Sequence, residues 1–324
     1  MARSARHRSG FAALIGRPNV GKSTLLNRLT GEKLAIVSPR PQTTRHRILG
    51  VVTRPEGQVA FLDTPGVHQA KGQLNRFMVD VALHAIDEVD LVVFLVEPPG
   101  VEKKSKAPPR LEIGEGNRFI LDRLQKANKP VILGINKIDA IHKPLLLPLI
   151  ELYRKEYPFA EVMPFSALKE EGLEELFAQC LKHLPEGPAL FEADTLTDQA
   201  ERVMVSEYIR EQVLRHCRDE IPYSAAVIVD IFDESEREPE KNRKVSRSGL
   251  AGLIRIEASI FVERESQKAI VIGKGGTMLK KIGTDARKSI ERLLGTHIYV
   301  SLRVRVEPRW SERAEGLRKL GYSE

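Results

Sequence analysis

Hydrophobic residues in the first half of the chain form short continuous runs that are separated by polar segments. Residues 11–15 and 59–62 are two such runs, and neither contains a charge. Runs of this length, bounded by loop residues, are typical of strands buried on both faces. Residues 24–29 follow the first run after a loop with two glycines, and they predict the opening of a helix. The ordered part of the chain is therefore expected to begin with a strand, a loop and a helix.

The second half of the chain predicts a separate set of elements. An amphipathic pattern predicts a helix from about residue 198 to 217, and a later helix is expected to end at residue 294. Strands are expected at residues 225–232, 253–263 and 297–306, and the apolar run 269–272 is expected to end a further strand. Proline and glycine at residues 184–188 predict the start of a linker. With 324 residues, 42% of them hydrophobic, the chain can bury two cores of ordinary size.

The loop between the first strand and its helix carries a phosphate-binding motif. It matches G-x-x-x-x-G-K-[ST] from Gly16 to Ser23. In such a loop the backbone amides and the helix N-terminus surround the phosphates, Lys22 reaches the β and γ oxygens, and the Ser23 hydroxyl binds Mg²⁺. A chance match is the alternative for the pattern alone, but the strand–loop–helix order argues against it. The residues expected to bind the phosphates are Gly16, Arg17, Pro18, Asn19, Val20, Gly21, Lys22, Ser23 and Thr24.

A segment that responds to the γ-phosphate is expected after the second apolar run. It consists of Asp63, Thr64, Pro65 and Gly66. Asp63 can be aimed at the magnesium ion through water, and the Gly66 amide can hold the γ-phosphate until hydrolysis lets the following segment relax. Upstream, residues 41–45 offer a threonine hydroxyl as a second protein ligand to Mg²⁺, with Thr44 favoured and Thr43 a close second.

Residues 136–139 make the predicted nucleotide site specific for guanine. The carboxylate of Asp139 can accept two parallel hydrogen bonds from the N1–H and N2–H₂ edge of guanine, where adenine presents an acceptor. The resulting discrimination is roughly 10⁴–10⁵ in favour of guanine, because an unpaired buried carboxylate is costly. We therefore expect GTP rather than ATP. The residues expected to bind the base are Asn136, Lys137 and Asp139, together with Ser166, Ala167 and Leu168, whose backbone groups follow an apolar stretch.

A second candidate site is a Gly-x-x-Gly loop followed by a predicted helix. The loop consists of Gly273, Lys274, Gly275 and Gly276, and the helix brings Lys280 and Lys281. Glycines let the backbone approach a sugar–phosphate chain closely and Lys274 adds charge, so about four single-stranded nucleotides can be clamped. A turn without a ligand is the alternative for so short a pattern.

Positive charge is concentrated around this second loop. The chain carries a net charge of +7, yet residues 241–324 hold 19 Lys and Arg against 9 Asp and Glu, whereas residues 1–240 hold 32 against 35. Scattered surface lysines would spread the charge over the whole chain. A concentration beside this loop instead indicates a basic surface that binds RNA. Trp310, the only tryptophan, is expected either to stack on a base or to close the core of the C-terminal domain, and packing is favoured.

Together with residues 42–47, these motifs resemble the Era family of phosphate-loop GTPases over nearly the whole chain. The resemblance implies an α/β GTPase domain with a mixed, mostly parallel sheet and flanking helices, followed by an α+β type II KH domain. It also implies a GTP-hydrolysing switch that binds 16S rRNA near its 3′ end and assists assembly of the 30S ribosomal subunit. The corresponding boundaries are a flexible basic N-terminus at 1–10, a GTPase domain at 11–184, a linker at 185–197, a KH domain at 198–310 and a tail at 311–324.

The residue after Gly66 constrains the mechanism. Val67 stands where Ras-like enzymes carry the glutamine that orients the attacking water, and an aliphatic side chain cannot do this. Similar GTPases with an apolar residue here use a potassium ion held by an asparagine of the phosphate loop. The resemblance thus implies Asn19 as a K⁺ ligand, while a purely conformational role of Asn19 remains open. Unassisted hydrolysis is expected at about 10⁻⁴–10⁻² s⁻¹.

Two polar segments and the two cysteines give further expectations about the surface of the chain and its compartment. Residues 97–116 and 234–252 are longer and more polar than the family pattern and predict surface insertions. Cys180 and Cys217 have no partners at zinc spacing, which indicates a reducing compartment and no structural metal.

The hydropathy of the chain bears on its location, and its C-terminal charge bears on a rival function. No apolar run approaches 18 residues, so neither a secretory signal nor a spanning helix is expected. We expect a cytoplasmic monomer whose basic surface can touch the cytoplasmic face of the membrane. The rival interpretation is a signalling or metabolic GTPase with a protein-binding C-terminal domain, which leaves the C-terminal charge unexplained.

Overall fold

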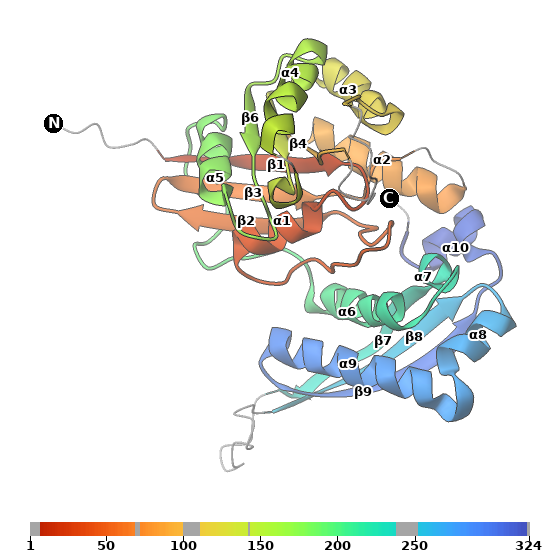
Figure 1. Cartoon of the computed structure of the whole chain (residues 1–324). Helices are drawn as coiled ribbons and strands as arrows, with labels where there is room; N and C mark the ends of the chain where they lie inside the picture. Colours follow the sequence, from red (N-terminus) through yellow and green to blue (C-terminus); the bar gives the residue numbers. More distant parts are fainter. Residues whose placement is uncertain (1–6, 69–71, 100–110, 142, 238–251, 323–324) are drawn as a thin grey trace. The chain divides into compact units, whose positions relative to one another are not determined.

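The structure, a computed structural model, describes residues 7–68, 72–99, 111–141, 143–237 and 252–322 (Figure 1). The chain divides into two compact units. The first comprises Met1–Ala35, Thr44–Lys71 and Asn75–Asp198, and the second comprises Ile36–Thr43, Gly72–Leu74 and Gln199–Glu324. The second unit therefore includes two short segments from the first half of the chain, which the sequence patterns did not indicate.

The first unit is built on a six-stranded sheet with the order β2-β3-β1-β4-β5-β6. Strand β2 runs antiparallel to β3, and all other neighbours are parallel. This is the mixed, mostly parallel sheet that the family resemblance implied. Its elements are β1 (Arg8–Gly16), α1 (Lys22–Thr30), β2 (Ile48–Arg54), β3 (Gly57–Asp63), α2 (Gln73–Asp87), β4 (Leu91–Val96), α3 (Glu115–Ala127), β5 (Val131–Ile135), α4 (Leu146–Glu156), β6 (Glu161–Pro164) and α5 (Leu173–Lys182).

Helices cover both faces of this sheet, which explains why its central strands are continuous apolar runs. One face packs against α2, α3 and α4 in a single hydrophobic core. On the other face, a Cβ at Gly50 of β2 would lie 2.5 Å from Leu26 of α1, and one at Gly57 of β3 would lie 2.5 Å from Leu181 of α5. Strand ends, and the loops that follow them, are consequently the parts of the unit that are left to bind a ligand.

The second unit is a three-stranded sheet with the order β7-β8-β9, in which β7 is antiparallel and β9 parallel to β8. Side chains from α6, α8 and α9 pack with alternate residues of the strands to form its core. Its elements are α6 (Glu201–His216), α7 (Ile221–Ser224), β7 (Ala226–Glu236), β8 (Leu253–Val262), α8 (Glu265–Ile272), α9 (Thr277–Leu294), β9 (His297–Val306) and α10 (Ala314–Lys319).

One element was predicted wrongly. Residues 269–272 form the last turn of helix α8 and not the end of a strand. The side chain of Gln267 accepts hydrogen bonds from the amides of Glu263 and Arg264, at 2.9 and 3.2 Å, and so stabilises the start of the helix. Val271 is buried while the neighbouring Ile270 is 51% exposed. Three consecutive β-branched residues look like a strand, but in the helix Val271 is buried in the core, Ile272 packs against it and Ile270 faces solvent.

The ends of the expected domains also differ from the structure. Strand β1 begins at Arg8, whose guanidinium donates to the carbonyl of Leu184 at 2.6 Å. The expected linker is attached to the first unit, because the side-chain carbonyl of Gln58 accepts the amides of Leu190 and Phe191. Of the expected tail, residues 314–319 form α10.

Trp310 serves the core of the second unit, as the sequence favoured. It is fully buried, its indole N–H donates to the carbonyl of Ser224 at 2.8 Å, and its ring stacks on Tyr322. A ring without exposed surface cannot stack on a nucleic-acid base. The expected insertions lie largely outside the described residues, at 100–110 and 238–251. In the part of the chain that is described, no helix has the length and apolar character needed to cross a membrane.

Candidate nucleotide and nucleic-acid sites

The phosphate loop takes the backbone conformation that the motif requires. Gly21, with φ of 104°, precedes the first residue of α1, and Asn19, with φ of 63°, is also left-handed. The buried ammonium group of Lys22 donates to the carbonyls of Gly16 and Arg17, at 3.1 and 3.0 Å. The loop therefore wraps around its own lysine. The positive charge of Lys22 and the N-terminus of α1 lie together, and both favour an anion.

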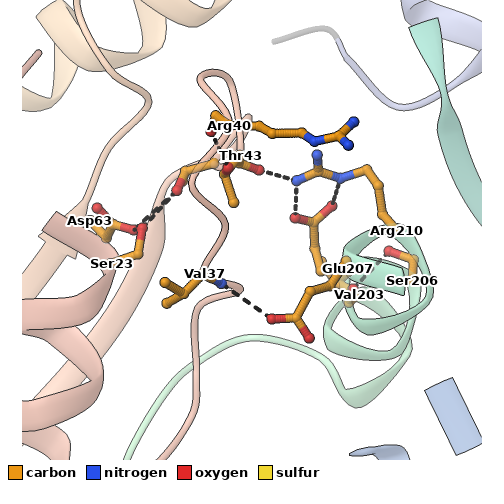
Figure 2. A network of polar contacts seen from close by, with 11 residues as sticks. Ser23, Val37, Arg40, Thr43, Asp63, Val203, Ser206, Glu207 and Arg210 are labelled. Atoms are coloured by element: carbon orange, nitrogen blue, oxygen red, sulfur yellow. Dashed lines mark hydrogen bonds and ion pairs between the residues drawn. The ribbon is translucent and has the colours of Figure 1, made fainter. Parts of the chain in front are cut away.

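The hydroxyl groups of Ser23 and Thr44 meet the carboxylate of Asp63. Figure 2 shows Ser23 beside Asp63. Ser23 Oγ lies 2.6 Å and Thr44 Oγ1 lies 3.3 Å from Asp63 Oδ2, and the two hydroxyls are 2.8 Å apart. The hydroxyl of Thr43 points elsewhere and donates to the carbonyl of Arg40 at 2.7 Å. Of the two threonines that the sequence left open, the structure brings Thr44 to the cluster.

Burial perturbs both charged groups at this point. It raises the pKa of Asp63 to about 6, against the opposing effects of Lys22 and of hydrogen bonds from Ser23, Thr44 and Thr64. Burial also lowers the pKa of Lys22 to about 8, an effect that Asp63 opposes. Water-excluded groups with shifted pKa values are typical of functional sites.

These residues fit a magnesium ion. Asp63 Oδ1 is buried and has no hydrogen-bond partner among the described residues, so it is an acceptor without a donor. Carboxylate and hydroxyl oxygens are the ligands that Mg²⁺ prefers. With nucleotide bound, Ser23 and Thr44 would hold the ion, with Asp63 beside it, and the ion would neutralise charge on the β and γ oxygens.

The segment after Asp63 lies against the phosphate loop. Thr64 donates its hydroxyl to the carbonyl of Leu14 at 2.8 Å, and the amide of Val67 donates to the carbonyl of Gly16 at 3.0 Å. A Cβ on Gly66 would lie 2.6 Å from the backbone nitrogen of Pro18, so only glycine fits there. Pro65 is also buried, so the backbone of this segment is held against the phosphate loop.

The predicted guanine residues come together from two loops, one after β5 and one after β6. Asn136 is buried: its side-chain carbonyl accepts the amides of Lys137 and Ala167, at 2.8 and 2.9 Å, and its NH₂ donates to the carbonyl of Val20 at 2.8 Å. It therefore ties the base-binding loops to the phosphate loop. Leu168 next to them is 63% exposed.

Two side chains of this site escaped the sequence interpretation. The hydroxyl of Ser166 donates to Asp139 Oδ1 at 2.6 Å, although only its backbone was expected to take part. Glu97, directly after β4, forms an ion pair with Lys137. A lone glutamate after an apolar run carries no motif, so only its position in space reveals it.

The Gly-x-x-Gly loop is a short turn between α8 and α9. Gly273, Gly275 and Gly276 have φ of 73°, 60° and 78°, all in the left-handed region that favours glycine. A Cβ on Gly273 would clash with Met278 at 2.7 Å, whereas Gly275 and Gly276 face open space. Lys274 is exposed at the tip, so backbone and charge are both presented to solvent.

A cleft of about 530 Å³ lies beside this loop, between α9 and β9. Its helical wall is basic and contains exposed Lys280 and Arg287, and its strand wall is apolar apart from Tyr299, which is 54% exposed. Lys281 is exposed but does not line the cleft. The lining residues are Gly276, Leu279, Lys280, Gly283, Thr284, Arg287, Ile298, Tyr299, Val300 and Leu302. The sequence interpretation missed Arg287 and Thr284, although their helical spacing from Lys280 was a usable signal.

Comparison with known proteins finds one family model for each half of the chain. Residues 11–137 match the family model "50S ribosome-binding GTPase", and residues 239–311 match the model "KH domain". The chain is 49% identical to GTPase Era of Geobacter metallireducens over 316 residues, which covers 98% of both chains.

Two solved structures match over 98% of this chain and 100% of their own, each at 38% identity. One is Era in complex with MgGDPNP and nucleotides 1506–1542 of 16S ribosomal RNA, with a TM-score of 0.86. The other is a variant of Aquifex aeolicus Era bound to GDP and AlF₄⁻, with a TM-score of 0.84.

Proposed function

The chain belongs to the GTPase Era family, and we propose that it is a GTP-controlled RNA-binding protein that recognises 16S rRNA near its 3′ end and assists assembly of the 30S ribosomal subunit. The observation that carries this proposal is the pairing of a guanine-specific nucleotide site with a basic cleft beside a Gly-x-x-Gly loop in one chain. Either site alone occurs in proteins of many functions.

The first unit supplies the GTPase. Lys22 and the amides of the phosphate loop bind the phosphates, and Ser23 and Thr44 hold Mg²⁺ beside Asp63. Asp139, oriented by Ser166, selects guanine. Hydrolysis transfers the γ-phosphoryl group to water and leaves GDP and phosphate. Since Val67 offers no hydrogen bond to that water, we place the intrinsic rate at about 10⁻⁴–10⁻² s⁻¹.

Potassium belongs to the same proposal. Asn19 is left-handed at the apex of the phosphate loop, and Val67 is fully buried with its amide bound to Gly16. The side chain of Val67 is aliphatic, so it cannot stabilise the charge that develops in the transition state. We assign Asn19 as a K⁺ ligand that supplies positive charge there.

The second unit supplies the RNA site. The loop glycines let a single strand approach the backbone, Lys274 and Lys280 meet phosphates, and the apolar wall of β9 receives bases. A relative of matching length is known in complex with nucleotides 1506–1542 of 16S ribosomal RNA. The family model whose description mentions the 50S ribosome covers only residues 11–137, outside this RNA site, so it does not redirect the proposal to the large subunit.

For location and assembly we propose a cytoplasmic monomer that also contacts the cytoplasmic membrane surface through its basic residues. The C-terminal excess of 19 Lys and Arg over 9 Asp and Glu supports attraction to anionic lipid as well as to RNA.

Titration with labelled RNA tests the proposal. The protein, loaded with a non-hydrolysable GTP analogue or with GDP, is mixed with single-stranded RNA that has the sequence of the 3′ end of 16S rRNA, and with a scrambled RNA of equal length. We expect tighter binding of the natural sequence in the GTP form. Equal, weak binding of both RNAs in both forms would favour a protein-binding C-terminal domain instead.

A further inference from the structure

The segment Ile36–Thr43 packs on helix α6, although it precedes that helix by more than 150 residues in the chain. Ile36 is buried in the core of the second unit. The amide of Val37 donates to Glu211 at 3.3 Å, and the carbonyl of Thr43 accepts a hydrogen bond from the Arg210 guanidinium (Figure 2). The segment is thus attached to α6 at both of its ends.

Arg210 has little freedom to move. Its side chain is 1% exposed, and Glu207 on the same helix binds it through two hydrogen bonds of 2.8 and 2.5 Å. Its Nη1 already lacks a partner among the described residues. Its Nη2 donates to both Glu207 and Thr43, so losing the Thr43 carbonyl would leave one buried Nη2 hydrogen without an acceptor, and buried unsatisfied hydrogens are costly. Arg210 therefore holds this carbonyl firmly.

The carbonyl of Thr43 and the amide of Thr44 belong to one peptide group, which is planar. A constraint on the first atom therefore limits the position of Thr44. The hydroxyl of Thr44 is the one that meets Ser23 and Asp63. A single peptide group thus connects a buried arginine of α6 to the threonine that the proposed function assigns to magnesium.

We propose that Arg210, oriented by Glu207, is a positioning residue for Thr44, and that it sets how tightly the protein binds Mg²⁺·GTP relative to GDP. The inference rests on the proposed function of Thr44 as a magnesium ligand. Threonine ligands of this kind are ordered by contacts to Mg²⁺ and the γ-phosphate, so only the GTP complex depends on them. Arg210 lies outside every nucleotide motif of the sequence.

The test measures the affinities of the full chain for a non-hydrolysable GTP analogue with Mg²⁺ and for GDP. In Arg210→Gln we expect the affinity for the GTP analogue to fall about tenfold, the effect of one hydrogen bond to a charged group, while GDP affinity changes less than twofold. Arg210→Lys keeps the charge but cannot bind Glu207 and Thr43 together as a planar fork does, so it should restore only part of the loss.

Arg202→Gln is the matched control. Arg202 lies on the same helix and donates to the carbonyls of Val229 and Asp230, not to the segment Ile36–Thr43. It should leave the ratio of the two affinities unchanged. Thermal unfolding identifies folded variants, and Glu207→Gln, which should lower the ratio by a smaller factor, serves if Arg210→Gln does not fold.

Three outcomes would count against the inference, and they are distinguishable. An unchanged ratio in the folded variants of Arg210 or Glu207, with a ratio that collapses in Thr44→Ala, overturns the positioning role alone. An unchanged ratio in Thr44→Ala overturns the magnesium assignment of the proposed function and the inference with it. A ratio that falls equally in Arg202→Gln would show a general effect of α6 and would also overturn the inference.

Discussion

Ser166 donates its hydroxyl hydrogen to Asp139, with 2.6 Å between Oγ and Oδ1. The hydroxyl occupies one lone pair of the carboxylate and orients it, so that the remaining lone pairs face the donors of a guanine base. Base selection therefore depends on a side chain 27 positions away in the sequence.

Asp139→Asn should move nucleotide preference from guanine to xanthine. The amide donates a hydrogen bond to the carbonyl oxygen that xanthine carries in place of the guanine amino group, and it can no longer accept both guanine donors. We expect GTP affinity to fall at least about 100-fold, within the range seen at sites that demand a hydrogen bond. Direct titration with GTP and XTP measures it. Asp122→Asn, an exposed residue of α3, is the control, and tight GTP binding by Asp139→Asn would refute the assignment.

Magnesium-dependent GTP binding should weaken as the pH falls through about 6. Burial raises the pKa of Asp63 to about 6, so the carboxyl is mostly charged at pH 7 and mostly protonated at pH 5. Protons then compete with Mg²⁺, and the affinity should drop about tenfold between these values. The γ-phosphate of GTP also changes its protonation in this pH range. Asp63→Asn, measured with the same nucleotide, is therefore the control that isolates the contribution of Asp63. If GTP affinity depends on pH equally in the parent and in Asp63→Asn, the assignment of Asp63 to the metal site is wrong.

GTP hydrolysis should be faster in KCl than in NaCl at equal ionic strength. A potassium ion held by Asn19 would stabilise charge that the aliphatic Val67 cannot. Phosphate release under single-turnover conditions measures the rate in each salt. Asn19→Ala should abolish the difference while the sodium rate stays near that of the parent. The same rate in both salts for the parent would exclude potassium from the mechanism.

The double substitution of Lys274 and Gly275 by Asp should abolish binding of single-stranded RNA. Two carboxylates would face phosphates at a place where Gly275 has φ of 60° and the backbone must come close. The affinity loss should reach several kcal/mol, about 1,000-fold. Fluorescence anisotropy measures it, and parent affinity should also fall steeply with salt.

The charge reversal Lys319→Glu is the control for this loop, because Lys319 of α10 pairs with Glu307 and does not line the cleft. GTP affinity should stay unchanged in the double variant. Full RNA binding by a folded double variant would show that the loop is only a turn.

Gly283→Ala should stabilise the fold but weaken RNA binding. Gly283 lies inside α9 and lines the cleft, where an added Cβ would reach 3.4 Å from Leu302, an ordinary contact distance. Alanine in a helix interior is favoured over glycine by about 1 kcal/mol, so the melting temperature should rise. The same methyl group narrows the cleft that receives a base. Thermal unfolding and RNA titration measure the two effects, and unchanged RNA affinity would place the bases elsewhere.

The sequence by itself determined the nucleotide motifs and most of the strands and helices. The phosphate loop could be predicted because its conformation depends on neighbours along the chain: Gly21 is left-handed where the loop meets α1, and Lys22 binds carbonyls five and six residues away. Continuous apolar runs likewise predict buried strands such as β4 without knowledge of their partners.

Only the tertiary structure decided the contacts between distant residues. It chose Thr44 over Thr43, brought Ser166 to Asp139, made residues 269–272 a helical turn and joined Arg210 to the carbonyl of Thr43. None of these follows from local pattern. Each depends on which side chains the packed sheets and helices leave buried together, and a buried polar group takes whatever partner the fold places within hydrogen-bonding distance.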